Sequence, residues 1–518
     1  MQKVKRLVKP FLHPSWLWRQ PTHGSCLQPA IKMAEFHIQS IHAGEQLLVN
    51  DIRLSFKQGE CLALVGESGS GKSLSALAMM NLLPNSLTSK AAFVHGEQPS
   101  VAMVFQEPMS ALNPSMRVGR QVAEAAEASL GLSRKAANEK ALTWFKHTQI
   151  ADPEQSFKKY PHQMSGGQRQ RVMIAMAMVM DPDIVIADEP TTALDASVAA
   201  DILSLIRQLQ KQEGMAMLLI SHDLSEVSRV ADHVMVMRQG QLMESGPTQQ
   251  VLNHPTSPYT QGLIASRPPE GRRPKRLPTV EDFMQNRPVD DSERPASQLG
   301  PVLLEIRDLS KAYAGQSVVK DLSLVIHEGE TLGLVGASGS GKSTIAKCLV
   351  NLVQPDAGEI RYRGERIDQL HGAKRQALAR DIQYIFQDPF ASLSPRMTIG
   401  DAITEPMVVH GLHSNSVGRK QAMEDLLKSV GFEALDASKY PHEFSGGQRQ
   451  RIGIARALAV EPKLIICDES VAALDVSIQA QVLNLLNDLK EQHSFSYLFI
   501  SHDELVVDYM SDAVLVLD

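Results

Sequence analysis

A glycine-rich loop that ends in lysine and serine is the first group of residues with a chemistry to offer. The stretch GESGSGKS follows the apolar run CLALVG and precedes the helix-like run KSLSALAMMNLL. In that setting the glycines let backbone N–H groups turn toward phosphate oxygens, and the helix start adds partial positive charge. The lysine is expected to reach the outer phosphates and the serine hydroxyl to ligate Mg²⁺. The predicted phosphate-binding residues are Gly66, Glu67, Ser68, Gly69, Ser70, Gly71, Lys72, Ser73 and Leu74.

The same loop recurs 270 positions later as GASGSGKS, again after an apolar run, TLGLVG. Three further motifs recur at a spacing of 280 residues, so the repeat is one whole domain written twice rather than a solenoid. A single copy of the phosphate-loop pattern could arise by chance. Two copies, each between a strand and a helix, are not explained in that way. The second set of predicted phosphate-binding residues is Gly336, Ala337, Ser338, Gly339, Ser340, Gly341, Lys342, Ser343 and Thr344.

Acidic pairs end the apolar runs IVIAD and LIICD, and a histidine follows each of the runs MLLIS and YLFIS. Alone, an acidic pair at a strand end is more often solvated, and a single histidine is usually structural. Behind a phosphate loop, the aspartates Asp188 and Asp468 are predicted to hold Mg²⁺ with Ser73 and Ser343. The glutamates that follow can polarise an attacking water, and the histidines can contact a γ-phosphate. The predicted catalytic residues are Glu189, His222, Glu469 and His502.

The polar motif SGGQ is repeated as well, roughly a hundred residues after each phosphate loop. In both copies a serine and two glycines precede a helical run that begins QRQR. A serine N-cap followed by glycines makes a helix start that can bind an anion. The residues assigned to nucleotide binding on this basis are Ser165, Gly166, Gly167, Gln168, Ser445, Gly446, Gly447 and Gln448.

The elements that must position these motifs are buried strands. Each of the apolar runs named above is short and continuous, which is typical of parallel strands covered on both faces. Their polar residues follow the last apolar residue, and open α/β sheets bind ligands beyond the carboxyl ends of their strands. The predicted fold class is therefore α/β, with a mainly parallel core sheet in each of two tandem P-loop domains.

In order and type, these motifs resemble the ATP-binding domain of ABC transporters, over nearly all of residues 34–518. The resemblance implies that ATP and Mg²⁺ are bound, that each domain carries a helical subdomain, and that SGGQ is the family's signature motif. It also implies that the two domains pair head to tail, with each signature completing the other domain's site. By the same resemblance, Gln106 and Gln387 join the metal residues, and Asp195, Asp475 and Tyr313 join the nucleotide-binding ones.

Finer features are similar to those of the peptide/nickel importer ATPases. They are FQEPMSALNP, FQDPFASLSP, the tripeptide YPH before each signature, and HPTSPYTQGL after the first copy. The tandem fusion most resembles ATPases of microcin C and oligopeptide uptake, with glutathione importers second and nickel importers a further alternative. The group implies two integral-membrane permease subunits, a periplasmic solute-binding protein, and a peripheral location on the cytoplasmic face of the bacterial inner membrane.

Rival classes of tandem ATPase fit less well. DNA-repair ATPases need zinc-binding CxxC pairs, whereas Cys26, Cys61, Cys348 and Cys467 are scattered and expected to be free thiols. Translation factors join their domains by a charged helix, whereas residues 266–301 are rich in proline. A net charge of −6 predicts no nucleic-acid partner, and no apolar run reaches the length of a membrane span.

The expected domains are an ATPase domain over residues 34–265, an exposed Pro-rich linker over 266–301, and a second ATPase domain over 302–518. Residues 1–33 are basic and aromatic; they could touch a membrane, but disorder, or a start at Met33, is the preferred reading. The second copy stops at SDAVLVLD, where the first continues, so it is expected to be truncated.

The two copies differ at positions that matter. Ala43 aligns with Tyr313, so adenine stacking is expected to be weaker in the first copy. Ser470 and Val471 replace Pro190 and Thr191 after the catalytic glutamate, and a modest effect on activity is expected. From the last loop glycine to the glutamine of FQ, the first copy has 35 residues and the second 46.

Overall fold

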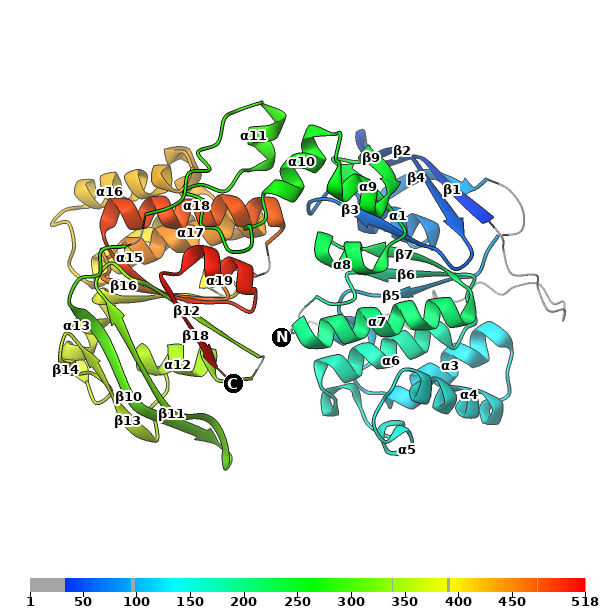
Figure 1. Ribbon diagram of the computed structural model, residues 1–518, viewed down its shortest axis with the longest axis horizontal. Coiled ribbons are helices and arrows are strands. Elements are labelled where there is room, and N and C mark those ends of the chain that lie inside the picture. The colour runs from blue at the N-terminus through cyan, green and yellow to red at the C-terminus, as the bar shows by residue number, and fades with distance from the viewer. Residues whose placement is uncertain are drawn as a thin grey trace, which may run out of the picture. The chain divides into compact units, whose positions relative to one another are not determined.

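The structure is a computed structural model that describes residues 33–94, 98–192, 194, 196–295, 297–337, 339–388, 392–472 and 474–517. The chain divides into two compact units, Met1–His254 and Pro255–Asp518 (Figure 1). The predicted site residues Asp195 and Ser338, and residues 1–32 of the basic extension, lie outside the described residues. Among the described residues, no helix combines the length and the apolar character needed to cross a membrane.

The core sheet of the first unit confirms the predicted buried strands. Its strand order is β5-β6-β7-β3-β8-β9, and every neighbouring pair is parallel except β8 with β9. The polar residues that follow β3, β5, β6 and β7 therefore lie together at the carboxyl edge of the parallel strands. The strands are β3 (Cys61–Val65), β5 (Val101–Val104), β6 (Ile184–Asp188), β7 (Ala216–Ile220), β8 (His233–Arg238) and β9 (Gln241–Pro247).

A small antiparallel sheet covers one side of the unit, with helix α1 (Lys72–Met79) packed within the same core cluster. Its order is β2-β1-β4, from β1 (Met33–Ala43), β2 (Gln46–Lys57) and β4 (Leu87–Phe93). Apolar residues alternate along β2, so its inner face joins the core through Val49, Ile52, Leu54 and Phe56. This layer holds the helix that follows the phosphate loop against the central strands.

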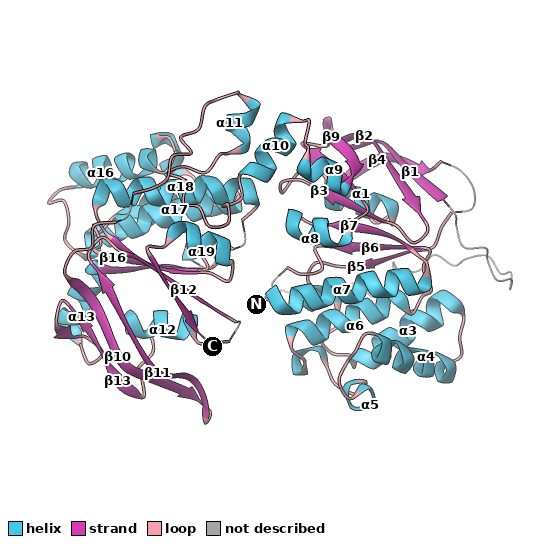
Figure 2. Ribbon diagram, in the orientation of Figure 1, coloured by secondary structure: helices cyan, strands magenta, loops and turns pink. Residues whose placement is uncertain are grey.

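Further helices complete the first unit (Figure 2). The helix that carries the signature, α6, packs against α3, α4 and β5, so a helical layer adjoins one end of the core sheet. The helices are α2 (Pro108–Ala111), α3 (Val118–Leu130), α4 (Arg134–His147), α5 (Pro153–Ser156), the 3₁₀ turn η2 (Pro161–Gln163), α6 (Gly166–Met178), α7 (Ala196–Glu213), α8 (Leu224–Val230) and α9 (Thr248–Asn253).

The second unit repeats the two-sheet design. Its core sheet has the parallel order β15-β16-β17-β12-β18, and its antiparallel sheet has the order β11-β10-β13-β14. The sequence GEIRYRGERI forms the predicted strand-turn-strand, β13 and β14. The strands are β10 (Val302–Tyr313), β11 (Gln316–His327), β12 (Thr331–Gly336), β13 (Ala357–Tyr362), β14 (Glu365–Arg366), β15 (Ile382–Ile385), β16 (Leu464–Asp468), β17 (Ser496–Ile500) and β18 (Ala513–Leu517).

Most helices of the second unit match those of the first, but α10, α11 and α13 have no counterpart among the described helices of the first unit. Helix α13 fills most of the extra length between the second phosphate loop and its glutamine. The helices are α10 (Pro258–Ala265), α11 (Val280–Met284), α12 (Lys342–Leu349), α13 (Gly372–Asp381), α15 (Ile399–Val409), α16 (Ser416–Ser429), the 3₁₀ turns η3 (Ala434–Ser438) and η4 (Pro441–Glu443), α17 (Gly446–Leu458), α18 (Val476–His493) and α19 (Glu504–Met510).

The segment predicted to be an exposed linker packs on the second unit instead. Leu277 and Val280 are fully buried, and Leu277 exchanges two backbone hydrogen bonds with the side-chain amide of Asn484 in α18, at 2.9 and 2.8 Å. Arg294 lies over the ring of Tyr509 in α19. The prediction of an exposed linker is wrong for these residues, because a few apolar and arginine side chains anchor a Pro-rich backbone. The division after His254 also assigns α10 to the second unit, whereas the sequence predicted a boundary at residue 265.

Candidate functional site

The two phosphate loops have the predicted position, each between a strand and a helix. The Lys72 ammonium in the first loop donates to the carbonyls of Gly66 and Glu67, at 2.7 and 2.9 Å. Lys342 repeats both bonds at the same distances. The lysine side chain therefore folds back over its own loop, where a phosphate can replace these carbonyls as its partner.

The last glycine of each loop cannot be replaced without strain. Gly71 and Gly341 cap α1 and α12 with φ angles of 100° and 96°, in the left-handed region that disfavours other residues. A Cβ atom on Gly71 would lie 2.8 Å from Val49, and one on Gly341 would lie 2.7 Å from Val319. The small antiparallel sheet thus sets how closely each loop approaches the core.

A serine hydroxyl and an aspartate meet beside each loop, as the sequence predicted. Ser73 donates to Asp188 at 3.4 Å, and Ser343 donates to Asp468 at 3.1 Å. Hydroxyl and carboxylate oxygens are hard donors, and Mg²⁺ is commonly held by one or two carboxylates together with substrate phosphates. The described residues include no cluster of three or more His, Cys, Asp or Glu suited to a metal. The residues present fit Mg²⁺.

Burial raises the pKa of Asp188 to about 6, although the hydrogen bond from Ser73 acts in the opposite direction. A nearby cation would restore the charged form by direct attraction. The aspartate is thus a carboxylate whose charge is costly until a positive partner arrives.

A glutamate, a glutamine and a histidine come together in each domain. The Gln106 amide donates to Glu189 Oε2 at 2.6 Å, and His222 Nδ1 lies 3.3 Å from Glu189 Oε1. In the second domain Gln387 donates to Glu469 at 2.6 Å, and His502 Nδ1 lies 3.8 Å from it. These residues come from three strand ends in each domain, and the structure places them side by side twice.

The electrostatics of the clusters favour ionised glutamates. Burial raises the pKa of Glu189, but the hydrogen bond from His222 and the charge of Lys72 outweigh it, so the pKa lies below its ordinary value. The neighbouring His502 imidazole lowers the pKa of Glu469, and the same contact raises the pKa of His502. An ionised glutamate is the form that can accept a proton from water.

Both glutamates have strained backbones. Glu189 and Glu469 have φ angles of 43° and 48°, which are uncommon for a residue with a side chain. Their N–H groups donate to the carbonyls of Ile220 and Ile500, the last residues of the neighbouring strands, at 2.9 Å in each case. Such conformations persist where the surrounding structure holds the residue in place.

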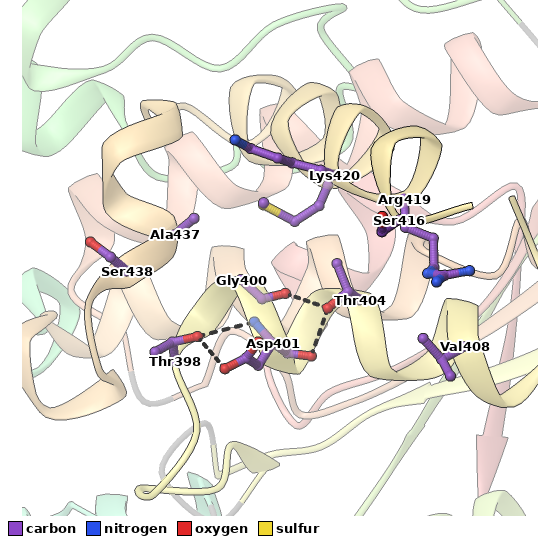
Figure 3. A pocket seen from close by; sticks show the side chains of 11 residues that line it. Thr398, Gly400, Asp401, Thr404, Val408, Ser416, Arg419, Lys420, Ala437 and Ser438 are labelled. Atoms are coloured by element: carbon purple, nitrogen blue, oxygen red, sulfur yellow. Dashed lines mark hydrogen bonds between the residues drawn. The ribbon is translucent and has the colours of Figure 1, made fainter.

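An open pocket of about 310 Å³ lies at this edge in the first domain. Its lining includes Met103, Phe105, Gln106 and Asp188, so two of the predicted metal residues of this domain, Gln106 and Asp188, face a common space. A separate pocket of about 400 Å³ lies among α15, η3 and α16 of the second domain (Figure 3). It is lined by polar residues such as Thr398, Asp401 and Lys420, and by none of the predicted site residues.

The signature motifs begin α6 and α17 as predicted. Ser165 and Ser445 cap these helices by accepting from the N–H groups of Gln168 and Gln448, at 3.3 and 3.4 Å. The Gln168 and Gln448 side chains accept from the serine N–H groups in return, so both are capping boxes. In each domain the motif belongs to the helical layer rather than to the strand edge.

The two positions predicted to contact adenine hold different side chains. Tyr313 ends β10, is 46 % exposed, and has the Lys311 ammonium 5.6 Å from its ring centre. Ala43 holds the same place in the first hairpin, paired with Gln46 as Tyr313 is paired with Gln316. An alanine offers no ring to stack on a base.

The change from Thr191 to Val471 has a packing explanation, whereas nothing in the structure explains the change from Pro190 to Ser470. In the first domain Thr191 donates to Glu226 at 2.6 Å, and Ser221 donates to the same carboxylate at 2.8 Å. In the second domain the matching positions hold Val471 and Val506, which are both fully buried in one core cluster. Next to the predicted catalytic glutamate, the polar pair of Thr191 and Glu226 is thus replaced by the apolar pair of Val471 and Val506.

One residue of the site was missed from the sequence. The Tyr384 hydroxyl donates to Asp468, beside the contact from Ser343. The visible signal was a tyrosine in YIFQ where the first copy has a methionine in MVFQ.

The ABC transporter family model matches residues 49–192 and 319–472. The chain belongs to the ABC transporter family. Each match begins before a phosphate loop and ends just after a predicted catalytic glutamate, so both domains are ABC-type ATPase domains.

Several proteins are similar to this ABC chain over most of its length. The glutathione import ATP-binding protein GsiA of Escherichia coli O157:H7 is 44 % identical over 515 residues, which cover 90 % of this chain and 81 % of that protein. GsiA of Salmonella paratyphi A is 42 % identical over 526 residues, covering 94 % and 84 %. An archaeal ribosome recycling factor solved with a ribosomal stalk protein matches 89 % of this chain and 83 % of that chain, with a TM-score of 0.59 and 21 % identity. At that identity the likeness concerns the fold alone.

Proposed function

We propose that this ABC ATPase powers a bacterial importer for peptides or peptide-like solutes, through permease subunits encoded separately. The observation that carries the proposal is the Gln–Glu–His cluster beside a phosphate-loop lysine, present in both domains. It is the machinery for ATP hydrolysis, and its presence in both domains argues against a non-catalytic scaffold. The similarity to proteins named for glutathione import supports import as the work that hydrolysis drives.

ATP is the substrate of these sites. In the proposed binding mode, Lys72 and Lys342 exchange their loop carbonyls for the outer phosphates, and the loop N–H groups and helix starts hold the remaining oxygens. Glu189 and Glu469 then accept a proton from the water that attacks the γ-phosphate, while His222 and His502 contact that phosphate. Before this can happen, the Gln106 and Gln387 amides must leave the glutamate oxygens that they occupy here.

Mg²⁺ is proposed to bind between Ser73 and Asp188, and between Ser343 and Asp468, with Gln106 and Gln387 as further oxygen ligands. When bound, the ion offsets negative charge on the phosphates. The serine and aspartate already lie within hydrogen-bond distance in both domains, so little rearrangement is required of them.

The two domains are proposed to pair head to tail, with the signature of each capping the γ-phosphate bound by the other. The capped helix starts at Ser165 and Ser445 suit this role, because they present N–H groups to an anion and lie away from the strand edge of their own domain. ATP binding then drives closure of the pair, and hydrolysis reopens it.

The proposed assembly contains two permeases that receive solute from a periplasmic binding protein, with this chain peripheral to the cytoplasmic face of the inner membrane. Glutathione is itself a small peptide, so a glutathione importer is the most specific form of the proposal that the relatives support. A nickel importer is a less favoured alternative. A DNA-repair role is a further alternative, and a translation-factor role draws only on likeness of fold.

A double variant tests the proposal. Replacing both Glu189 and Glu469 by glutamine keeps side-chain size and removes the proton acceptor, so ATP should still bind while hydrolysis and solute uptake are lost. Uptake is measured in cells or vesicles with the permeases from neighbouring reading frames, using labelled glutathione and labelled oligopeptides. Full uptake by the double variant contradicts an ATPase motor, and uptake of neither solute by the wild type contradicts the substrate class.

A further inference from the structure

A tyrosine in the second domain supports the aspartate proposed to hold Mg²⁺. Tyr384 belongs to β15 and lies opposite Ile466 of β16 in the parallel register, so its side chain is carried toward the end of that strand. There the phenol hydroxyl donates to Oδ2 of Asp468, while Ser343 donates to Oδ1. The two carboxylate oxygens thus have different partners, which fixes the rotation of the group.

The contact is buried, and its burial makes it strong. Tyr384 and Asp468 are 9 % and 6 % exposed, so water competes little for either group. A buried phenol usually needs a polar partner, and the Asp468 carboxyl group supplies one here. Phe386 packs 4.5 Å from the ring of Tyr384, centre to centre, which further restricts the ring.

The first domain lacks this support. Met103 occupies the matching place, three residues before the glutamine and opposite Ile186 of β6 in the same register. It is as buried as Tyr384, at 7 % exposed, but its thioether has no hydrogen to donate. The serine contact is also longer there, at 3.4 Å from Ser73 to Asp188 against 3.1 Å in the second domain.

We propose that Tyr384 is a positioning residue that pre-orients Asp468 for a divalent cation, so that the second domain's nucleotide site binds the metal more tightly than the first. The inference rests on the proposed role of Ser343 and Asp468 in holding Mg²⁺. A carboxylate already held by Tyr384 loses less rotational freedom when the metal arrives, and its Oδ1 edge stays turned toward Ser343. Outer partners of metal ligands commonly change metal affinity by about 10- to 100-fold. The fold therefore contains two unequal metal sites.

The test measures metal binding rather than turnover. The full chain carries Glu189→Gln and Glu469→Gln so that ATP persists, and Mn²⁺ replaces Mg²⁺ so that free ion can be counted by electron paramagnetic resonance. The parent protein should show two classes of ATP-dependent Mn²⁺ site. Tyr384→Phe keeps the ring and removes only the hydroxyl, and it should weaken the tighter class by about tenfold. Tyr384→Met, which copies the first domain, should make the two classes alike.

A matched control removes another buried hydroxyl from the same sheet. Tyr497 on β17 donates to the carbonyl of Leu486, away from Asp468, so Tyr497→Phe should leave both Mn²⁺ classes unchanged. Unaltered Mn²⁺ binding in Tyr384→Phe, or an equal loss in Tyr497→Phe, overturns the role of Tyr384. A parent protein with no ATP-dependent Mn²⁺ binding contradicts the proposed metal site itself, which is a separate failure.

Discussion

Asp232 and Asp512 hold the same place in the two domains but have different partners. Each accepts a hydrogen bond at 2.8 Å from the first residue of the strand that leads to the phosphate loop, Cys61 or Thr331. In the first domain Arg207 neutralises Asp232 through two contacts of 2.8 Å. The position that matches Arg207 is Asn487 in the second domain, and it carries no charge.

The second domain replaces that missing charge from two sources. Lys490 and Arg273 both lie 3.2 Å from Asp512, and Ser297 donates to it at 2.8 Å. Arg273 and Ser297 belong to the segment between the domains, and Arg294 of the same segment donates to Asn487 at 2.9 Å. A repeated domain can therefore keep its motifs although the partners of a supporting aspartate change. In the second domain, part of that partner set comes from residues upstream of the first strand.

Replacing one of the proposed catalytic glutamates is expected to give the largest difference in ATP turnover between the two domains. Glu469→Gln should lower hydrolysis at its own site by about a thousandfold, because a positioned general base commonly contributes about 10²- to 10⁴-fold. If the second site is the better one, through Tyr313 and Tyr384, this variant should cost more total turnover than Glu189→Gln. Steady-state phosphate release by the purified chain measures both. Equal losses would show that the two sites contribute alike.

Asp512→Ala should destabilise the second domain by about 3 kcal/mol. The substitution leaves Lys490 and Arg273 without their acidic partner in a largely buried site. Asp512 is 11 % exposed and Asp232 is 37 % exposed. Asp232→Ala should therefore cost the first domain less, at about 1 kcal/mol. Urea unfolding followed by domain-specific fluorescent probes separates the two transitions. A larger effect in the first domain contradicts the comparison.

The stability that Asp512 gives to the second domain should depend on pH in a defined direction. Burial raises the pKa of Asp512, but Lys490 and the N–H of Thr331 outweigh it, so the pKa lies below its ordinary value. A lowered folded pKa gives stability that is present above the unfolded pKa and is lost as pH falls through the folded one. The gap in stability between wild type and Asp512→Ala should narrow in acid and stay constant near neutral pH.

The packed segment between the domains offers a test with an internal control. Leu277 is fully buried and Leu299 is 53 % exposed, although both belong to the stretch that the sequence predicts to be a linker. Leu277→Ala should destabilise the second domain by about 2 to 3 kcal/mol, as large-to-small core changes do. Leu299→Ala should change its stability by less than about 0.5 kcal/mol. Similar small effects for both would restore the exposed-linker interpretation.

Substitutions at the positions predicted to stack on adenine should have the smallest effect, which is on the affinity for ATP. Base stacking on an aromatic ring is worth about 1 to 3 kcal/mol, so Tyr313→Ala should weaken ATP binding at the second site by about tenfold. Ala43→Tyr should tighten binding at the first site by a smaller factor, since its loop was not selected around a ring. Titration with a fluorescent ATP analogue measures both affinities. No change in Tyr313→Ala would remove this residue from the site.

Local chemistry explains what the sequence could predict. Three kinds of local feature could be read from short stretches of sequence. They are the glycine before Lys72, the serine cap at Ser165 and the acidic residue that ends a buried strand. These features predicted the phosphate loops, the helix starts and the strand ends. The contact from Tyr384 to Asp468 depends on the register of two strands far apart in the chain. The burial of Leu277 and the pairing of Val471 with Val506 within one core likewise depend on tertiary packing, which no local pattern carries.

The central claim is that each signature serves the site of the other domain. The direct measurement is nucleotide trapping with a photoreactive ATP analogue in Ser165→Arg and Ser445→Arg variants, followed by peptide mapping of the label. The account predicts that Ser165→Arg removes label from peptides around Tyr313 in the second domain, and that Ser445→Arg removes it from peptides around Ala43 in the first. Loss of label from each variant's own domain would contradict it.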